Sequence, residues 1–185
     1  LAVGVTAGLA VLIKVFAVFP VAGLLIAALL SSLGFRGCWK NPKAFVMGVI
    51  AAAIPAAYYL LTIGDTANSF FSFWTLSFIP LLKQGWFYIR WIDFIDGLVN
   101  FELIILGLIS VFLLTRRDRA LVLGLWIGYL IYGLFVPYQI HTHEYYSLVL
   151  VPIVALSLAQ VGSLILGKIE GEGKFWQGAA LLVLV

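Results

Sequence analysis

The sequence predicts an all-α fold, a polytopic transmembrane helix bundle that forms a single domain. Hydrophobic residues make up 64% of the 185 residues and charged residues only 10%, and the mean hydropathy is +1.14. A soluble domain of this length cannot bury so much apolar surface, because surface-to-volume scaling limits the size of its interior. Apolar stretches that approach the length of a bilayer crossing also recur along the whole chain, as in multi-pass membrane proteins.

Charged and turn-forming residues divide these apolar stretches into about six or seven spans, since a crossing needs roughly 20 apolar residues. The sequence begins at Leu1 without a methionine and ends inside an apolar run, so we expect a fragment, residues 1–185, of a longer membrane protein. Its first and last spans are expected to be truncated. The predicted spans cover approximately residues 1–13, 15–33, 44–63, 98–115, 120–136, 145–167 and 175–185.

Lys14 divides the first long apolar stretch, residues 1–33. A lysine in the middle of a span would cost roughly 2.5–3.5 kcal/mol on insertion scales. We therefore expect two elements, one ending near Ile13 and one running from about Val15 to Leu33, with Lys14 at the interface or facing a wet cavity. The alternative is one kinked helix whose lysine extends to the membrane surface.

Residues 64–97 form the longest interruption between spans, and aromatic side chains are mixed there with charged ones. Aromatic residues that alternate with charges are typical of the lipid headgroup level. We therefore expect one or two short helices that lie in the membrane interface within this external loop. The aromatic residues concerned are Phe70, Phe71, Phe73, Trp74, Phe78, Trp86, Phe87, Tyr88 and Trp91.

The loop charges predict the orientation of the chain. Residues 34–43, 115–119 and 168–174 hold most of the lysine and arginine, which assigns these loops to the cytoplasm by the positive-inside rule. The intervening segment His141–Tyr146 then lies on the non-cytoplasmic side of a multi-pass protein, which we expect in a bacterial or archaeal plasma membrane. The basic residues are scattered and form no stripe, which argues against nucleic acid as a partner. A single cysteine, Cys38, excludes a disulfide framework.

The densest polar cluster, residues 137–146, contains both histidines of the chain and lies between two apolar spans. The span that begins near Tyr145 is expected to present its free backbone N–H groups and its positive dipole end at the outer surface, where they favour an anion. His143 and Tyr146 add side-chain donors at the same level, and Lys14 would add a positive charge. We expect Lys14, His143, Tyr145 and Tyr146 to bind the phosphate of a lipid whose tail lies between helices.

Glu144 would repel such a phosphate if it faced it. The repulsion is avoided if Glu144 turns away or is protonated. Glu144 could instead orient His141 or His143 or cap the first helical turn, and acid–base chemistry by Glu144 or His143 is a further possibility. A metal site made by His141, His143 and Glu144 is a weaker alternative. Two histidines at i and i+2 point apart on a helix and could converge only in an extended turn, so no metal is expected.

Three other interpretations of the cluster stay open. Histidine and tyrosine are common in interfacial belts because they are amphipathic. A transporter or permease fragment would use Lys14, Glu102 and His143 as buried ionisable groups along a substrate or proton path. A membrane scaffold without chemistry is the third alternative.

One segment of the chain reads His143-Glu144-Tyr145-Tyr146-Ser147-Leu148-Val149-Leu150-Val151-Pro152-Ile153-Val154-Ala155. It resembles the H-x-Y-Y-x-x-P-x-x-P segment of the polytopic GT-C glycosyltransferases, which are related to protein O-mannosyltransferases and lipid A aminoarabinose transferases. The stretch Gly8-Leu9-Ala10-Val11-Leu12-Ile13-Lys14, with Pro20 downstream, is similar to their G-L-A-x-x-x-K stretch. Val149 departs from the pattern, because the family often has its first proline there. The resemblance covers most of the chain.

This resemblance implies a function. Family members transfer a sugar from a polyprenyl-phosphate-linked donor to a protein, lipid or glycan acceptor on the non-cytoplasmic face, so the donor is a substrate and no cofactor is implied. By position, Tyr145 or Tyr146 with His143 would contact the lipid phosphate, and Lys14 would line the same cavity. The family's catalytic aspartate, in the first external loop, has no counterpart here. The fragment would therefore contain no catalytic residue and would be inactive alone.

Overall fold

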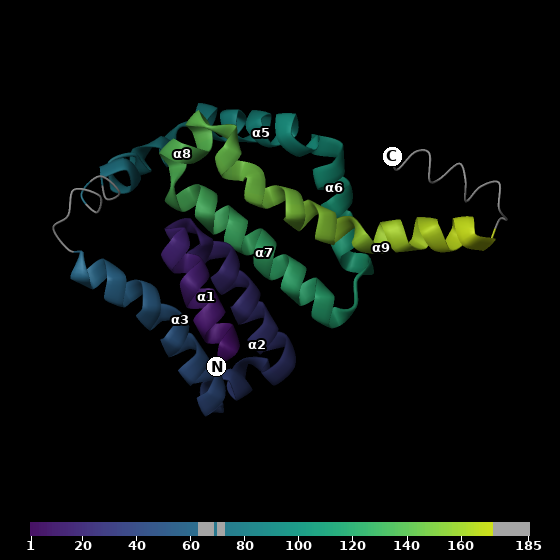
Figure 1. The fold of residues 1–185 in the computed structure, drawn as a ribbon. Helices are drawn as coiled ribbons and strands as arrows, with labels where there is room; N and C mark the ends of the chain where they lie inside the picture. Colours follow the sequence, from purple (N-terminus) through teal and green to yellow (C-terminus); the bar gives the residue numbers. More distant parts are fainter. Residues whose placement is uncertain (63–68, 70–72, 172–185) are drawn as a thin grey trace.

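The computed structural model describes residues 1–62, 69 and 73–171, and in this part of the chain it contains helices and no strand (Figure 1). The all-α prediction is therefore confirmed. The predicted span 175–185 and part of the 64–97 loop lie outside the described residues. The α-helices are α1 (Ala2–Ile13), α2 (Val18–Lys40), α3 (Pro42–Leu61), α5 (Gly85–Val99), α6 (Phe101–Ser110), α7 (Arg116–Phe135), α8 (Pro137–Thr142) and α9 (Leu150–Gly171), and the 3₁₀ turns are η1 (Val15–Ala17), η2 (Ile79–Lys83), η3 (Val111–Leu113) and η4 (Glu144–Val149).

Four helical stretches of the described residues are long and apolar enough to cross a bilayer. There are five if the bent pair of α5 and α6 counts as one span, by length and composition. These numbers agree with an integral membrane protein. α1, which corresponds to the predicted span 1–13, has only 12 residues and is shorter than a full crossing. The four stretches are Val15–Lys40, Pro42–Leu61, Arg116–Phe135 and Glu144–Lys168.

The chain divides at Lys14, as one of the two sequence interpretations predicts. Lys14 has extended backbone angles, φ −143° and ψ 104°, and lies between the end of α1 and the start of η1. The alternative of one kinked helix is wrong.

At the next junction, the Asn41 side chain accepts hydrogen bonds from the backbone N–H groups of Lys43 and Ala44, with Pro42 at the first helical position. This is a favourable way to begin a helix, and it explains why α3 starts here.

The basic segment 34–43 differs from its prediction as a loop. Helical structure continues to Lys40 and is interrupted only at Gly34, whose angles are φ 68° and ψ 168°. Glycine reaches this region without the steric penalty that a β-carbon brings. The chain therefore changes direction at Gly34 and resumes as a short helical turn, residues 35–40.

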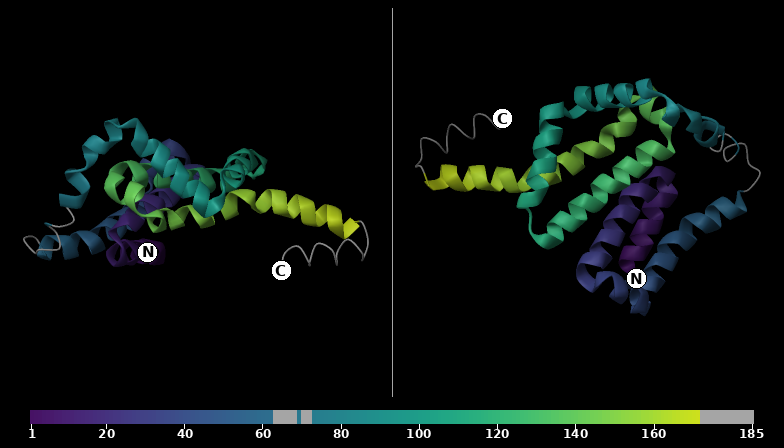
Figure 2. Two further views of the ribbon diagram at one scale, coloured as in Figure 1. Left: turned by 90° about the horizontal axis from the view of Figure 1, so that it is seen from above. Right: turned by 180° about the vertical axis from the view of Figure 1, so that it is seen from behind.

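Glycines let α2 and α7 approach closely. A β-carbon at Gly128 would lie 2.6 Å from the carbonyl oxygen of Phe19, and one at Gly23 would overlap the carbonyl oxygen of Gly124. Membrane helices use such small residues to bring their backbones together, because lipid gives no hydrophobic drive for association. α1 lies against α3 beside this pair, and the second half of α9 extends away from the other helices (Figure 2).

α5 lies across one end of the bundle and bends by 85° into α6 (Figure 1). The bend occurs at Asn100, which has φ 60°, and the Asp96 carboxylate accepts a 2.7 Å hydrogen bond from the backbone N–H of Phe101. The helix therefore starts at Phe101, three residues after the predicted start of the span. Phe87 and Trp91 of α5 are buried in the hydrophobic core, so these two side chains pack against other helices of the chain.

Candidate functional site

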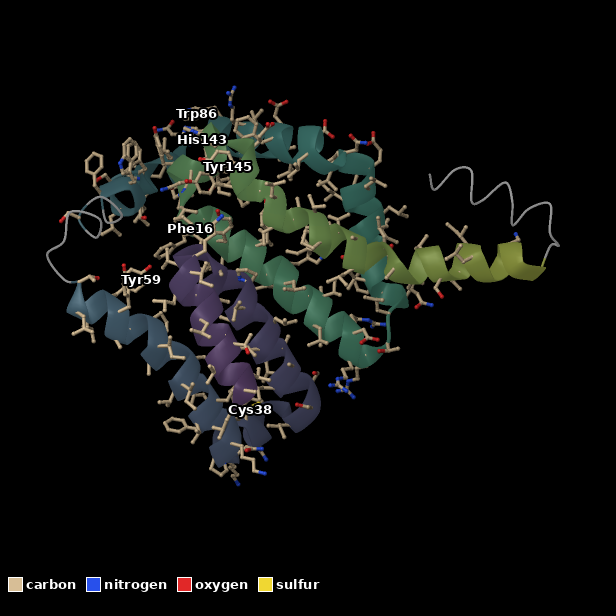
Figure 3. The ribbon with its side chains drawn as sticks, in the orientation of Figure 1. Phe16, Cys38, Tyr59, Trp86, His143 and Tyr145 are labelled. Atoms are coloured by element: carbon tan, nitrogen blue, oxygen red, sulfur yellow. The ribbon has the colours of Figure 1, made fainter. Side chains whose placement is uncertain are left out.

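A pocket of about 190 Å³ lies at the end of the bundle where α1 stops and η4 begins. Two segments that are distant in the sequence form it, the stretch after α1 and the turn η4. Figure 3 shows Phe16, His143 and Tyr145 at this end and Cys38 at the opposite end. The lining residues are Lys14, Phe16, Ala17, Pro20, Tyr132, Tyr145, Tyr146, Leu148 and Val149.

Phe16 connects the first segment to the rest of the pocket. The turn η1 follows Lys14 directly and places the Phe16 ring 5.6 Å from that of Tyr132 and 6.2 Å from that of Tyr146, centroid to centroid. Aromatic pairs at such distances contribute about 0.5–1.5 kcal/mol beyond their buried area. These contacts fix the position of Lys14, two residues earlier, at the edge of the pocket.

The turn η4 is anchored from beneath by a buried chain of hydrogen bonds. The Trp91 indole N–H of α5 donates to the Tyr129 hydroxyl of α7 at 2.9 Å, and Tyr129 donates to the hydroxyl of Ser147 at 3.0 Å. Ser147 is completely buried, while its neighbours Tyr145 and Tyr146 turn toward the pocket with ring centroids 4.5 Å apart. Since a buried donor or acceptor that lacks a partner is costly, this chain determines how the turn is held.

His143 contacts the rings of both tyrosines. Its ring centroid is 5.2 Å from that of Tyr145 and 6.0 Å from that of Tyr146, and its Nδ1 lies 2.7 Å from the hydroxyl oxygen of Thr142. His143 is exposed and does not line the pocket. It therefore contacts the pocket residues and not the pocket itself.

His141 occupies a different environment. Its Nδ1 donates to the carbonyl oxygen of Pro137 at 2.9 Å, and its ring lies among those of Trp86, Phe87 and Tyr138. No group of three histidine, cysteine, aspartate or glutamate side chains that could hold a metal ion exists among the described residues. His141, His143 and Glu144 therefore do not form such a group in the described structure.

Glu144 is exposed at the start of η4 and makes no hydrogen bond to either histidine. The Nδ1 atoms of both rings contact other oxygens, so no hydrogen bond in the described structure supports an orienting role for Glu144. The expected helix N-terminus at Tyr145 also differs. Residues 144–149 form a 3₁₀ turn, α9 begins only at Leu150, and the N–H of Tyr146 is bonded to the carbonyl oxygen of His143.

Positive charge in the pocket therefore comes from a side chain and not from a helix end. Lys14 is exposed, and it has no ion-pair partner in the part of the chain that the structure describes. Tyr145, half exposed, brings a hydroxyl to the same pocket. The pocket combines one ammonium group and phenol hydroxyls with an otherwise apolar wall.

No family model, no curated protein and no solved structure matches the chain.

The sequence did not point to Phe16 and Tyr132 as pocket residues, nor to Trp91 and Tyr129 as supports of the η4 turn. Tyr129 and Tyr132 are three residues apart on α7, a spacing that puts both on one helix face. This spacing was the one available signal. The partners of these rings depend on tertiary contacts between segments that are far apart along the chain.

Proposed function

We propose that this chain is the lipid-phosphate-binding part of a polytopic membrane glycosyltransferase, which transfers a sugar from a polyprenyl-phosphate-linked donor to an acceptor on the non-cytoplasmic face. The observation that carries the proposal is that Lys14 and the pair Tyr145 and Tyr146 line one pocket. An ammonium group and hydroxyl donors suit a phosphate, and the apolar wall suits the first isoprene units of its lipid. The resemblance to GT-C glycosyltransferases assigns the same residues to the donor phosphate.

Lys14 would contribute most when the sugar leaves the phosphate. In the transfer, the acceptor oxygen bonds to the sugar carbon and the bond from this carbon to the phosphate oxygen breaks, so negative charge grows on the departing lipid phosphate. A fixed positive charge beside the oxygen that gains this charge stabilises the transition state. The base that deprotonates the acceptor would come from a part of the enzyme outside this chain, so the chain alone binds the donor without transferring the sugar.

The arrangement of charges supports the proposed orientation. Cys38, in the basic segment 34–43, and the residues His143 and Tyr145 lie at opposite ends of the bundle (Figure 3). If the basic end faces the cytoplasm, the pocket opens on the non-cytoplasmic side. Arg90, Asp93 and Asp96 are exposed on α5, opposite the buried side of this helix, so α5 would lie in the headgroup layer at that surface, among the six or seven spans of the sequence prediction.

A binding measurement tests the proposal without requiring catalysis. The purified chain in detergent is titrated with a short-chain polyprenyl monophosphate, and Lys14→Gln is expected to weaken binding about tenfold or more, since hydrogen bonds to charged groups contribute about 1.5–3 kcal/mol. Lys168→Gln removes an exposed charge of the same kind at the far end of α9 and should leave binding unchanged. Equal binding of the phosphate-free polyprenol, or equal affinity of the Lys14 variant, would exclude the proposed role.

The alternative of a transporter or permease fragment lacks a comparable observation. It requires Lys14, Glu102 and His143 as buried groups along one path. All three are exposed in the described structure, and Glu102 lies in the first turn of α6, where the helix dipole favours a carboxylate without further partners. A scaffold without chemistry would leave the pocket without a use.

A further inference from the structure

The corner between α2 and α3, residues 34–43, carries a second group of cations at the end of the bundle opposite the pocket (Figure 3). Gly34 redirects the chain there, and residues 35–40 form a short helical turn. A β-carbon at Gly37 would lie 3.2 Å from that of Leu33, so this turn folds back tightly against the end of the preceding helix. We call residues 34–43 the α2–α3 corner.

An aromatic pair projects from one side of this corner. Phe35 and Trp39 are four residues apart, so they share one face of the turn, and their ring centroids are 6.4 Å apart in an edge-on arrangement. Phe35 is 70% exposed and Trp39 80% exposed, so no described helix covers them. Exposed aromatic rings at the end of a membrane helix are typical of the layer between headgroups and acyl chains.

A basic pair follows directly beside the aromatic one. Arg36 and Lys40 are also four residues apart, and each lies about 100° around the turn from its aromatic neighbour. Lys43 is exposed at the beginning of α3. The α2–α3 corner contains no acidic residue, and none of the three cations has an ion-pair partner among the described residues. By contrast, the basic turn at residues 116–119 includes Asp118.

We propose that the α2–α3 corner binds an anionic phospholipid. Arg36, Lys40 and Lys43 surround its headgroup phosphate, and Phe35 and Trp39 contact the upper part of its acyl chains. A guanidinium group binds phosphate oxygens in a bidentate manner and two ammonium groups add positive charge. The headgroup of a zwitterionic lipid carries a cation of its own, which the three basic residues repel, so such a lipid should bind more weakly. This site is independent of the Lys14 pocket, and its ligand chemistry follows from the corner alone.

Trp39 provides the reporter for the test. The chain is placed in mixed micelles that contain phosphatidylglycerol or phosphatidylcholine with brominated acyl chains, which quench tryptophan at close contact, and the Trp39 signal is the difference between the wild type and Trp39→Phe. Wild-type Trp39 should be quenched at a lower fraction of brominated phosphatidylglycerol than of brominated phosphatidylcholine. Each cation removed should reduce this preference about fivefold, the effect expected of one basic residue near an anionic surface.

Two triple variants, each lacking three positive charges, distinguish an effect of the α2–α3 corner from an effect of the total charge of the chain. Arg36→Gln/Lys40→Gln/Lys43→Gln should lose the preference for phosphatidylglycerol, whereas Arg116→Gln/Arg117→Gln/Lys168→Gln, which removes three exposed cations elsewhere, should keep it. The single variant Lys40→Gln should already show the fivefold loss while its circular dichroism matches the wild type. Equal loss in both triple variants, equal quenching by the two lipids, or displacement of the brominated lipid by inorganic phosphate would overturn the proposal.

Discussion

The phenol of Tyr129 donates a 3.0 Å hydrogen bond to the hydroxyl of Ser147 and accepts one of 2.9 Å from the indole N–H of Trp91. The three side chains are buried and come from α7, η4 and α5, respectively. This chain of bonds joins the helix that crosses the end of the bundle to the turn that carries Tyr145 and Tyr146. It is therefore the support of the candidate site.

Tyr129→Phe should lower the free energy of unfolding by about 1–3 kcal/mol, because it leaves the buried Trp91 N–H and Ser147 hydroxyl without their partner. It should also weaken polyprenyl phosphate binding, since the η4 turn loses its anchor. Unfolding in denaturant followed by circular dichroism and titration with the lipid measure the two effects. Tyr88→Phe removes a 2.9 Å bond to the carbonyl oxygen of Leu82 at an exposed position and should change neither; equal effects of both substitutions would contradict the support role.

Gly124→Ala should lower the free energy of unfolding by about 1–3 kcal/mol through overpacking. The added β-carbon would overlap the carbonyl oxygen of Gly23 and lie 2.6 Å from the β-carbon of Ala27, so α2 and α7 would have to separate. Gly48→Ala is the matched control, because nothing lies within 4 Å of its β-carbon. Gly48→Ala should raise the free energy of unfolding by up to about 1 kcal/mol, because alanine has a higher helix propensity than glycine. Denaturant unfolding of both variants gives the comparison, and a stabilised Gly124→Ala would disprove the close approach.

Ser157→Ala should lower the free energy of unfolding by about 1–3 kcal/mol. The fully buried Ser157 hydroxyl accepts a 3.0 Å hydrogen bond from the indole N–H of Trp126 and joins α9 to α7. After the substitution this N–H is buried without a partner. Ser31→Ala, at an exposed serine that bonds to its own helix backbone, should stay within about 0.5 kcal/mol. Thermal unfolding of the two variants decides whether the Trp126 bond is needed.

The two histidines should differ in a binding assay. His143→Ala removes ring contacts with Tyr145 and Tyr146 and should weaken polyprenyl phosphate binding about two- to tenfold, the range of one or two aromatic contacts. His141→Ala removes contacts with Trp86 and Phe87 and should leave the affinity unchanged. Titration of both variants with the same lipid measures this difference. A reversed order would mean that the polar cluster binds the lipid elsewhere.

Much of the helical layout could be predicted from the sequence. Long uncharged stretches coincide with α3, α7 and α9, and the single charge of Lys14 correctly divides the first apolar stretch into two elements. These features depend on local composition, because each membrane helix satisfies its own backbone hydrogen bonds. The break at Gly34 was misplaced as a loop, since glycine and basic residues are also typical of loops and only the backbone angles distinguish a kink.

The candidate site could be predicted only in part. Lys14, Tyr145 and Tyr146 stand out in the sequence because polar groups are rare in it, and the structure puts these three around one pocket. The different environments of His141 and His143 could not be predicted, because they depend on which helix each ring meets. The hydrogen bond between Tyr129 and Ser147 could not be predicted either, because nothing in the sequence indicates that these two side chains are buried next to each other.

The pocket joins the first described helix to a turn near the last one, which has a consequence for biosynthesis. When a ribosome feeds this chain into the membrane, Lys14 is inserted long before Tyr145 and Tyr146 are translated. Nascent chains halted ahead of η4 would therefore contain the cation without its phenol neighbours. Under the proposed function, binding of the lipid donor would therefore begin only late in translation.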